Sequence, residues 1–308
     1  MPLLQSADWP LLIDLYFFLA GLAGGAFVIA TIAHLVGGPR SREVVRVGYY
    51  LSLLALIPCP LLLVVDLGIP SRFLHMLMVT KPDPTIGAAA INIGPFHIKL
   101  FSPMNMGAWA LLGFGVLAFL AALSVFLEDA KRGRNLWALR TTVGVIGGFF
   151  GFFLAAYPGV LLGATARPLF QNASFLGALF LAVGASTGAA AIALILSFLG
   201  QEAGETLGRL RQIIIPVLLL QAATLALFLL RVGMSGGEGA AQSLALLLSG
   251  PYSLVFWVGA VAVGLIVPFA LQVASRQPGL AAISAALILV GGFLVKYVII
   301  AAGQAVLS

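Results

Sequence analysis

Residues 15–37 read LYFFLAGLAGGAFVIATIAHLVG, a stretch of 23 residues without Asp, Glu, Lys or Arg. About 20 apolar residues in a helix cross the roughly 30 Å hydrocarbon core of a bilayer. Seven further runs of similar character follow in the sequence. The eight predicted spans are 15–37, 48–65, 104–127, 141–164, 174–199, 211–230, 250–274 and 280–302. We therefore predict an all-α integral membrane protein, with residues 1–308 forming a single polytopic membrane domain.

Composition supports this interpretation and excludes several classes of protein. Of the 308 residues, 61% are hydrophobic and 8% are charged, against roughly 25% charged residues in soluble domains. A soluble enzyme, a nucleic-acid-binding protein and a secreted disulfide scaffold are excluded. The single cysteine, Cys59, cannot form an internal disulfide or hold an iron–sulfur cluster. Only His34 lies inside an apolar run, so we expect neither haem nor an iron–sulfur cluster in this protein.

The distribution of Lys and Arg between the loops predicts the orientation. The loops after the first, third, fifth and seventh spans carry ten of these residues, and the opposite loops carry five. Cytoplasmic loops are the ones enriched in Lys and Arg. Both termini are therefore expected on the outer side of the membrane.

Two spans share a small-residue pattern. FLAGLAGGA in the first span holds Gly21 and Gly25, and FLAVGASTGAA in the fifth holds Gly184 and Gly188. Such pairs allow close helix packing in membranes. The similarity is compatible with two four-helix bundles, although small-residue pairs are common in membrane helices. Between the second and third spans, residues 86–101 are expected to be interfacial or re-entrant.

Ionisable residues near the spans gather toward the outer face. A residue of this kind is costly in lipid and is a candidate functional residue. Asp14 and Asp66 lie at span boundaries, where a carboxylate could exchange a proton with a bound redox ligand or simply be solvated. Asp66 and Arg72 bracket a Gly-x-Pro turn that is expected to hold them as a salt bridge.

The remaining candidates each have an alternative interpretation. Tyr16 and Tyr157 lie about one turn inside the outer face, where tyrosines also form the interfacial aromatic belt. Lys296 lies seven residues from the end of its span, so its side chain is expected to snorkel to the surface. Arg167 belongs to the same outer group, and His75 could contact a partner protein or the ligand of the group.

Several motifs together resemble the NrfD-like family, the membrane-subunit family of polysulfide reductase. They are GLAGGAF (21–27), DLGIPSRFLHML (66–77), SPMNMGAWAL (102–111), YPGVLLGATARPLF (157–170), GLIVPFAL (264–271) and GGFLVKYVIIAAGQ (291–304). The resemblance covers nearly the whole sequence, and the combination of the third and fourth motifs is the most specific.

The resemblance implies a subunit of the bacterial inner membrane that binds a quinone near the outer face. Menaquinone and ubiquinone both remain open as its ligand. By motif, Tyr157 would hydrogen-bond a quinone carbonyl, Asp66 and Arg72 match the family pattern, and Tyr16 stands where a relative carries His. Lys296 stands where the family often has Arg, which keeps the charge but loses the bidentate geometry.

The partners that the resemblance implies are an iron–sulfur, ferredoxin-like subunit and, beyond it, a molybdopterin or multihaem catalytic subunit. The loop 66–103 is the expected docking surface. Its polar residues are Arg72, His75, Lys81, Asp83, Asn92, His97 and Lys99.

Two other functions remain open. A purely structural anchor would hold a partner at the membrane without a site of its own. A secondary transporter would place charged or broken-helix features at the midplane, where the sequence offers only Pro58, Pro60 and Pro216.

Overall fold

The computed structural model describes residues 9–38, 41–78, 90–93, 96–99, 102–130, 136–171, 173–199, 203–235, 237–274 and 277–306. The first half of the protein contains α1 (Leu11–Val36), α2 (Arg42–Leu56), α3 (Pro58–Asp66), the 3-10 segment η2 (Pro70–Met76), α4 (Pro103–Asp129) and α5 (Trp137–Gly163). The second half contains α6 (Pro168–Gln171), α7 (Leu176–Phe198), α8 (Ala203–Ser235), α9 (Glu238–Leu248), the π-helical segment η4 (Val255–Ile266), α10 (Val267–Ala274) and α11 (Pro278–Gln304).

In the part of the protein that is described, eight helical stretches are long and apolar enough to cross a membrane, which confirms the predicted number. The second stretch joins α2 and α3, and the seventh joins η4 and α10. Both the second and the sixth stretch are longer than the sequence indicated, because amphipathic turns extend them beyond the apolar run. The molecule is thus a multi-pass membrane protein.

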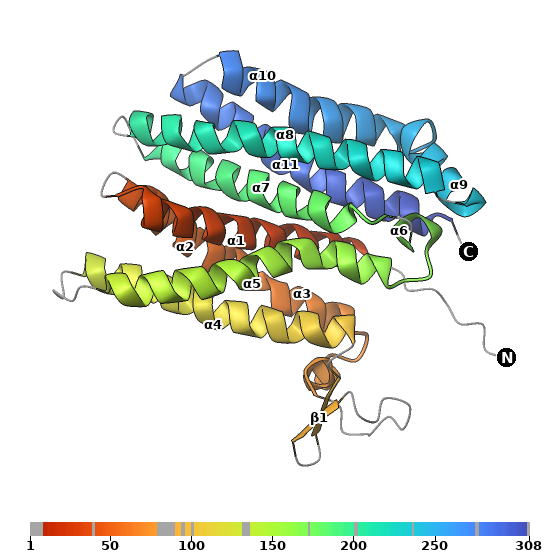
Figure 1. Cartoon of the computed structure of the whole chain (residues 1–308), viewed down its shortest axis with the longest axis horizontal. Helices are drawn as coiled ribbons and strands as arrows, with labels where there is room; N and C mark the ends of the chain where they lie inside the picture. The colour runs from red at the N-terminus through yellow and green to blue at the C-terminus, as the bar shows by residue number, and fades with distance from the viewer. Residues whose placement is uncertain are drawn as a thin grey trace.

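The helices run side by side along one long axis (Figure 1). In the first half, α1 packs against α2 and α5, and α4 packs against α2 and α5. In the second half, α7 packs against α8 and α11, and η4 packs against α11. The two halves meet chiefly where α1 packs against α7, which we call the seam.

Glycines allow the backbones of α1 and α7 to approach each other closely at the seam. A Cβ atom added to Gly25 would lie 2.0 Å from the carbonyl oxygen of Gly184, and one added to Gly188 would lie 2.3 Å from the nitrogen of Ala26. A side chain at either position would therefore force the backbones of α1 and α7 apart. The two Gly-x-x-x-Gly pairs seen in the sequence contact each other directly across this seam.

Proline divides the second span. α2 ends at Leu56 and α3 begins at Pro58, which has no N–H for a helical hydrogen bond. After α3, Gly68 has a φ of +67°, a conformation that glycine adopts without strain. After this turn, η2 contacts α3 and α4.

A small hairpin follows η2. Strands β1 (Ala90–Ile93) and β2 (Phe96–Lys99) pair antiparallel, with Asn92 opposite His97. The segment expected to be interfacial or re-entrant is therefore a hairpin over these residues. Lys81 and Asp83 of the expected docking surface lie outside the described residues, as do the side chains of Asn92 and His97.

Trp9, before α1, and Gln304, at the end of α11, are hydrogen-bonded to each other. We call the end of the molecule where they meet the terminal end (Figure 1). The Gln304 side-chain amide donates to the Trp9 backbone carbonyl at 3.1 Å, and the backbone N–H of Trp9 donates to the Gln304 side-chain oxygen. The end of α1, the start of α2, the end of α4 and the start of α5 lie at the opposite end (Figure 1).

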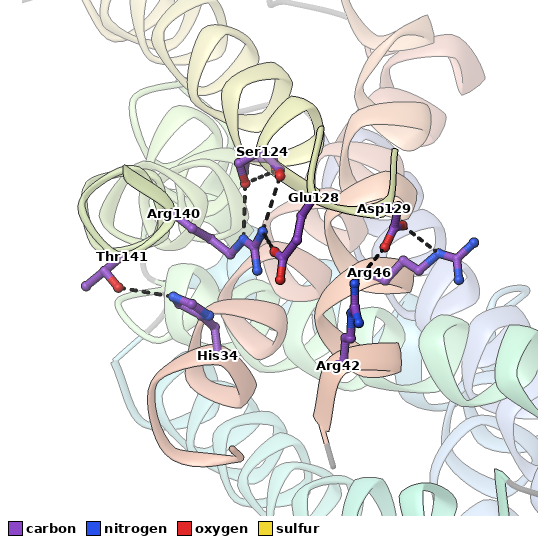
Figure 2. A network of polar contacts seen from close by, with 9 residues as sticks. His34, Arg42, Arg46, Ser124, Glu128, Asp129, Arg140 and Thr141 are labelled. Atoms are coloured by element: carbon purple, nitrogen blue, oxygen red, sulfur yellow. Dashed lines mark hydrogen bonds and ion pairs between the residues drawn. The ribbon is translucent and has the colours of Figure 1, made fainter. Parts of the chain in front are cut away.

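At the opposite end, polar side chains of four helices form a paired network (Figure 2). The buried Arg140 of α5 forms an ion pair with Glu128 of α4 and also donates to the Ser124 carbonyl at 3.2 Å. His34 of α1 is hydrogen-bonded to Thr141 of α5 at 3.1 Å. A second group in the network joins Asp129 of α4 to Arg42 and Arg46 of α2, at 3.2 and 3.3 Å.

Candidate functional site

A small cavity of about 110 Å³ lies at the terminal end of the first-half helices. It is enclosed by α1, α3, η2, α4 and α5 together with Trp9. Three of the residues singled out in the sequence, Tyr16, Asp66 and Tyr157, line it together. The other lining residues are Trp9, Ile13, Phe17, Leu63, Leu67, Met76, Met104, Gly107, Ala108 and Leu161. We call this the tyrosine cavity.

Tyr157 is held in the wall of the tyrosine cavity by a hydrogen bond and by ring stacking. The hydroxyl donates to the Pro103 carbonyl at 2.8 Å, and the ring stacks on Phe153 with centroids 5.7 Å apart. Gly107 makes room for the phenol, because a Cβ there would lie 2.3 Å from Cζ of Tyr157. The hydroxyl hydrogen is thus engaged with the start of α4, while the oxygen keeps lone pairs for a further donor.

Tyr16 and Asp66 offer freer polar groups. Tyr16 is 3% exposed, and the described residues give its hydroxyl no hydrogen-bond partner. The Asp66 side chain ends α3 at the exposed rim of the cavity. A buried hydroxyl without a partner and a solvated carboxylate are suited to donating to a bound carbonyl and exchanging a proton with water.

Arg72 and His75 lie on η2, outside the tyrosine cavity. The expected salt bridge is wrong for this structure: no ion pair within 4.0 Å joins Asp66 to Arg72 among the described residues. Both side chains are exposed, and the turn around Gly68 directs the two segments apart. His75 contacts only its own segment in the described part, at 3.3 Å from the Arg72 carbonyl.

Asp14 lies in the first turn of α1, where the helix dipole favours a carboxylate. It is 3% exposed, and its Oδ1 has no hydrogen-bond partner among the described atoms. It is absent from the lining of the tyrosine cavity. The solvated interpretation of Asp14 is therefore wrong, because the carboxylate is enclosed by protein.

Lys296 does not snorkel. Its side chain is 0% exposed, and Nζ donates to the Phe17 carbonyl of α1 at 2.6 Å. Nζ also lies 5.1 Å from the ring centroid of Phe180 on α7. The side chain points across the helix bundle instead of along α11 to the surface, so it lies in the seam and not in the cavity lining.

Arg167 has a position of its own at the terminal end. It is 5% exposed, and its Nη1 donates to the carbonyls of Gln304 and Val306 at 2.8 and 3.4 Å. These contacts fix the end of α11 against the segment after α5. Arg167 is not among the residues that line the tyrosine cavity.

Two residues of SPMNMGAWAL have roles that sequence reasoning missed. The Asn105 amide donates to the carbonyls of Met76 and Leu77 at 2.8 and 2.9 Å, and the Trp109 indole donates to Leu77 at 3.0 Å. They fasten the end of η2, and with it the cavity residue Met76, to α4. Their spacing of four residues on one helix face was a usable signal.

An apolar groove of about 520 Å³ adjoins the tyrosine cavity. The two share Leu63, Met76 and Ala108. The groove runs between α2–α3 and α4, with exposed side chains such as Leu112 and Phe119 along it. A ring with an apolar tail therefore has a continuous surface that leads from the outside of the helices to polar groups.

The family model for polysulphide reductase, NrfD, matches residues 3–308. The protein belongs to this family. A polysulfide reductase polypeptide of Wolinella succinogenes is 31% identical over 310 residues, which covers 96% of this protein and 93% of that one. The protein NrfD of Escherichia coli (strain K12) is 28% identical over 330 residues, covering 96% of this protein and 94% of that one.

A shorter match links the protein to another reductase of this kind. A selenate reductase subunit from Mesobacillus selenatarsenatis is 26% identical over 81 residues, 26% of this protein. These relatives confirm the resemblance seen in the motifs. This NrfD-family protein is accordingly related to the membrane subunits of oxidoreductase complexes.

Proposed function

We propose that this NrfD-family protein binds a quinone in the tyrosine cavity and passes electrons between the quinone pool and an iron–sulfur partner. The observation that carries the proposal is that Tyr16, Asp66 and Tyr157 line one cavity that adjoins an apolar groove. A quinone has two carbonyls that accept hydrogen bonds and an apolar tail. Bound here, it would supply the two-electron, two-proton chemistry that side chains lack.

The protein's own residues then bind and handle protons. Tyr16 donates its free hydroxyl to one carbonyl oxygen. Tyr157 donates its hydroxyl hydrogen to Pro103, so its oxygen can accept from the hydroxyl of the reduced quinol, and its anchored ring fixes the ligand's position. Asp66, at the exposed rim, exchanges the protons with water. The apolar groove holds the tail and keeps the cavity open to lipid.

The proposed orientation places this site on the outer side of the bacterial inner membrane. The start of α1 and the end of α11 lie at the terminal end, and the helix ends that flank the loops with most Lys and Arg lie at the opposite end. The partner subunits would dock on the terminal end, over η2. We further propose that residues 1–308 are one polytopic membrane domain made of two four-helix bundles that meet at the seam.

A ligand-binding experiment separates this function from that of a structural anchor. The full-length protein in lipid nanodiscs should bind a naphthoquinone analogue, measured by quenching of tryptophan fluorescence, because Trp9 lines the cavity. Tyr16→Phe should weaken binding about fivefold, corresponding to one hydrogen bond of about 1 kcal/mol. Phe149→Leu, on the same helix but 73% exposed and outside the cavity lining, is the matched control and should bind normally.

Tyr157→Phe is expected to act more broadly than Tyr16→Phe. It leaves the Pro103 carbonyl without its donor, so it should weaken binding and also lower the thermal midpoint slightly. Wild-type protein that fails to bind the analogue, while still assembling with its partners, would favour the structural anchor.

A further inference from the structure

Lys296 occupies a fitted socket in the seam. The Phe17 carbonyl of α1 accepts from Nζ at 2.6 Å, and the Phe180 ring of α7 presents its face to Nζ at 5.1 Å. Gly21 completes the socket, because a Cβ there would lie 2.7 Å from Nζ. A carbonyl oxygen and an aromatic face are both ligands for a positively charged ammonium group.

The socket lacks a counter-ion among the described residues. No carboxylate there lies within 4.0 Å of Nζ. The acidic residue on this face of α1 is Asp14, which lies seven residues, or two helical turns, before Gly21. A positive charge buried without a paired carboxylate is costly, and such residues in membrane proteins usually serve a function.

The tyrosine cavity adjoins the socket through Phe17. Tyr16 and Phe17 line the cavity, and the Phe17 carbonyl accepts from Lys296 Nζ. The charge therefore lies beside a residue of the cavity lining without itself lining the cavity. Phe17, Phe180 and Lys296 are all 0% exposed, so the positive potential is screened less here than it would be in water.

We propose that Lys296 is an electrostatic positioning residue that makes the tyrosine cavity favour ligands carrying negative charge on the ring oxygens. This inference rests on the proposed quinone site and adds the charge preference of that site. A quinone held there would carry negative charge on its ring oxygens when the proposed iron–sulfur partner reduces it, and Lys296 would stabilise that charge without touching the ligand.

Two ligands of similar shape test the charge preference. 2-Hydroxy-1,4-naphthoquinone is an anion at neutral pH, and 2-methoxy-1,4-naphthoquinone is neutral. Dissociation constants of both are measured by calorimetry on the full-length protein in nanodiscs. In Lys296→Gln, whose amide can still donate to the Phe17 carbonyl, the constant for the anion should rise about tenfold. The constant for the neutral ligand should change less than twofold.

Three further variants keep the test decisive. Lys296→Arg retains the charge and should retain the preference for the anion, while Lys296→Met should lose it as the Gln variant does. Arg209→Gln removes a partly exposed positive charge at the opposite end of the molecule and should change neither constant. Thermal midpoints identify any variant whose fold is altered.

Each outcome decides between the two levels of the proposal. Equal weakening of both ligands in Lys296→Gln, or no change in either, would overturn the electrostatic role while leaving the quinone site intact. If neither ligand binds the wild-type protein, the quinone site itself is wrong, and the role of Lys296 is overturned with it.

Discussion

The polar side chains at the two ends of the first-half helices differ in how they are hydrogen-bonded and ion-paired. At the opposite end, Arg140 is paired with Glu128, and Asp129 is bridged by two arginines (Figure 2). At the terminal end, one buried Asp14 oxygen has no hydrogen-bond partner among the described atoms, and the Tyr16 side chain lines the tyrosine cavity. Satisfied networks hold helices together, whereas unsatisfied buried groups require another explanation, often a ligand. At the opposite end the pairing holds α2, α4 and α5 together, whereas at the terminal end the Tyr16 side chain faces the tyrosine cavity, where a ligand can meet it.

The largest expected effect is the all-or-none response of a topology reporter. A phosphatase active only outside the cytoplasm, fused after Ser308, should give full activity, because we place the terminal end outside. The same reporter inserted in the loop 131–135 should be inactive. Reversed signals would put the tyrosine cavity on the cytoplasmic side and exclude the docking arrangement that we propose.

Asp66→Asn should have the next largest effect. It removes the proton-exchanging group at the rim, so quinone-linked turnover of the assembled complex should fall about 100-fold, the lower range for lost proton-transfer catalysis. The thermal midpoint should not change, because the exposed carboxylate has no ion-pair partner among the described residues. Glu238→Gln, which changes an exposed carboxylate at the start of α9, is the matched control and should keep full turnover; an equal loss there would show that the effect of Asp66→Asn is not specific to the cavity rim.

Arg140→Met tests the paired end. It leaves Glu128 and the Ser124 carbonyl without their donor and should lower the free energy of unfolding by about 2–3 kcal/mol. Quinone-analogue binding by the folded fraction should be unchanged. Arg42→Gln, on the exposed pair with Asp129, should cost about 0.5 kcal/mol or less. Both free energies of unfolding are measured by denaturant titration in the same detergent. Equal losses in Arg140→Met and Arg42→Gln would contradict the distinction between the buried and the exposed ion pair.

The sequence predicted the fold well because apolar length is a local property. Each span could be located from its own residues, and the contact between Gly21/Gly25 and Gly184/Gly188 follows from small residues that permit it. The grouping of Tyr16, Asp66 and Tyr157 was predictable because all three lie at the same ends of their helices.

Side-chain direction was the part that sequence reasoning could not supply. Lys296 was expected at the surface because its distance from the helix end permits snorkelling, but the rotation of α11 points it at α1. Asp66 and Arg72 were expected to pair because they bracket a turn, yet the positive φ of Gly68 sets their directions. The directions of these side chains depend on the rotation of each helix about its axis and on the angles at which helices cross. The hydropathy of the sequence does not contain this information.

The smallest expected effect is on transmembrane proton movement, where we predict none beyond quinone chemistry at the terminal end. Halfway along α7, the hydroxyl of Ser186 donates to Gln221 of α8 at 2.6 Å, and that of Thr187 donates to the Val183 carbonyl at 2.7 Å. Thr224 likewise donates to the Leu220 carbonyl at 2.9 Å. These neutral groups are already hydrogen-bonded, and none of them changes charge.

A proton path would have to link groups that do change charge across about 30 Å. Lys296 lies eight residues from the end of α11, about 12 Å from the terminal end, and the network around Arg140 lies at the other end. The complex in tight vesicles should therefore take up or release only the protons of quinone chemistry, followed with a pH-sensitive dye. Extra protons abolished by an uncoupler would show that the unpaired Ser52 hydroxyl and bound water bridge the two ends, and the contrast between paired and unpaired regions would then extend through the whole helix bundle.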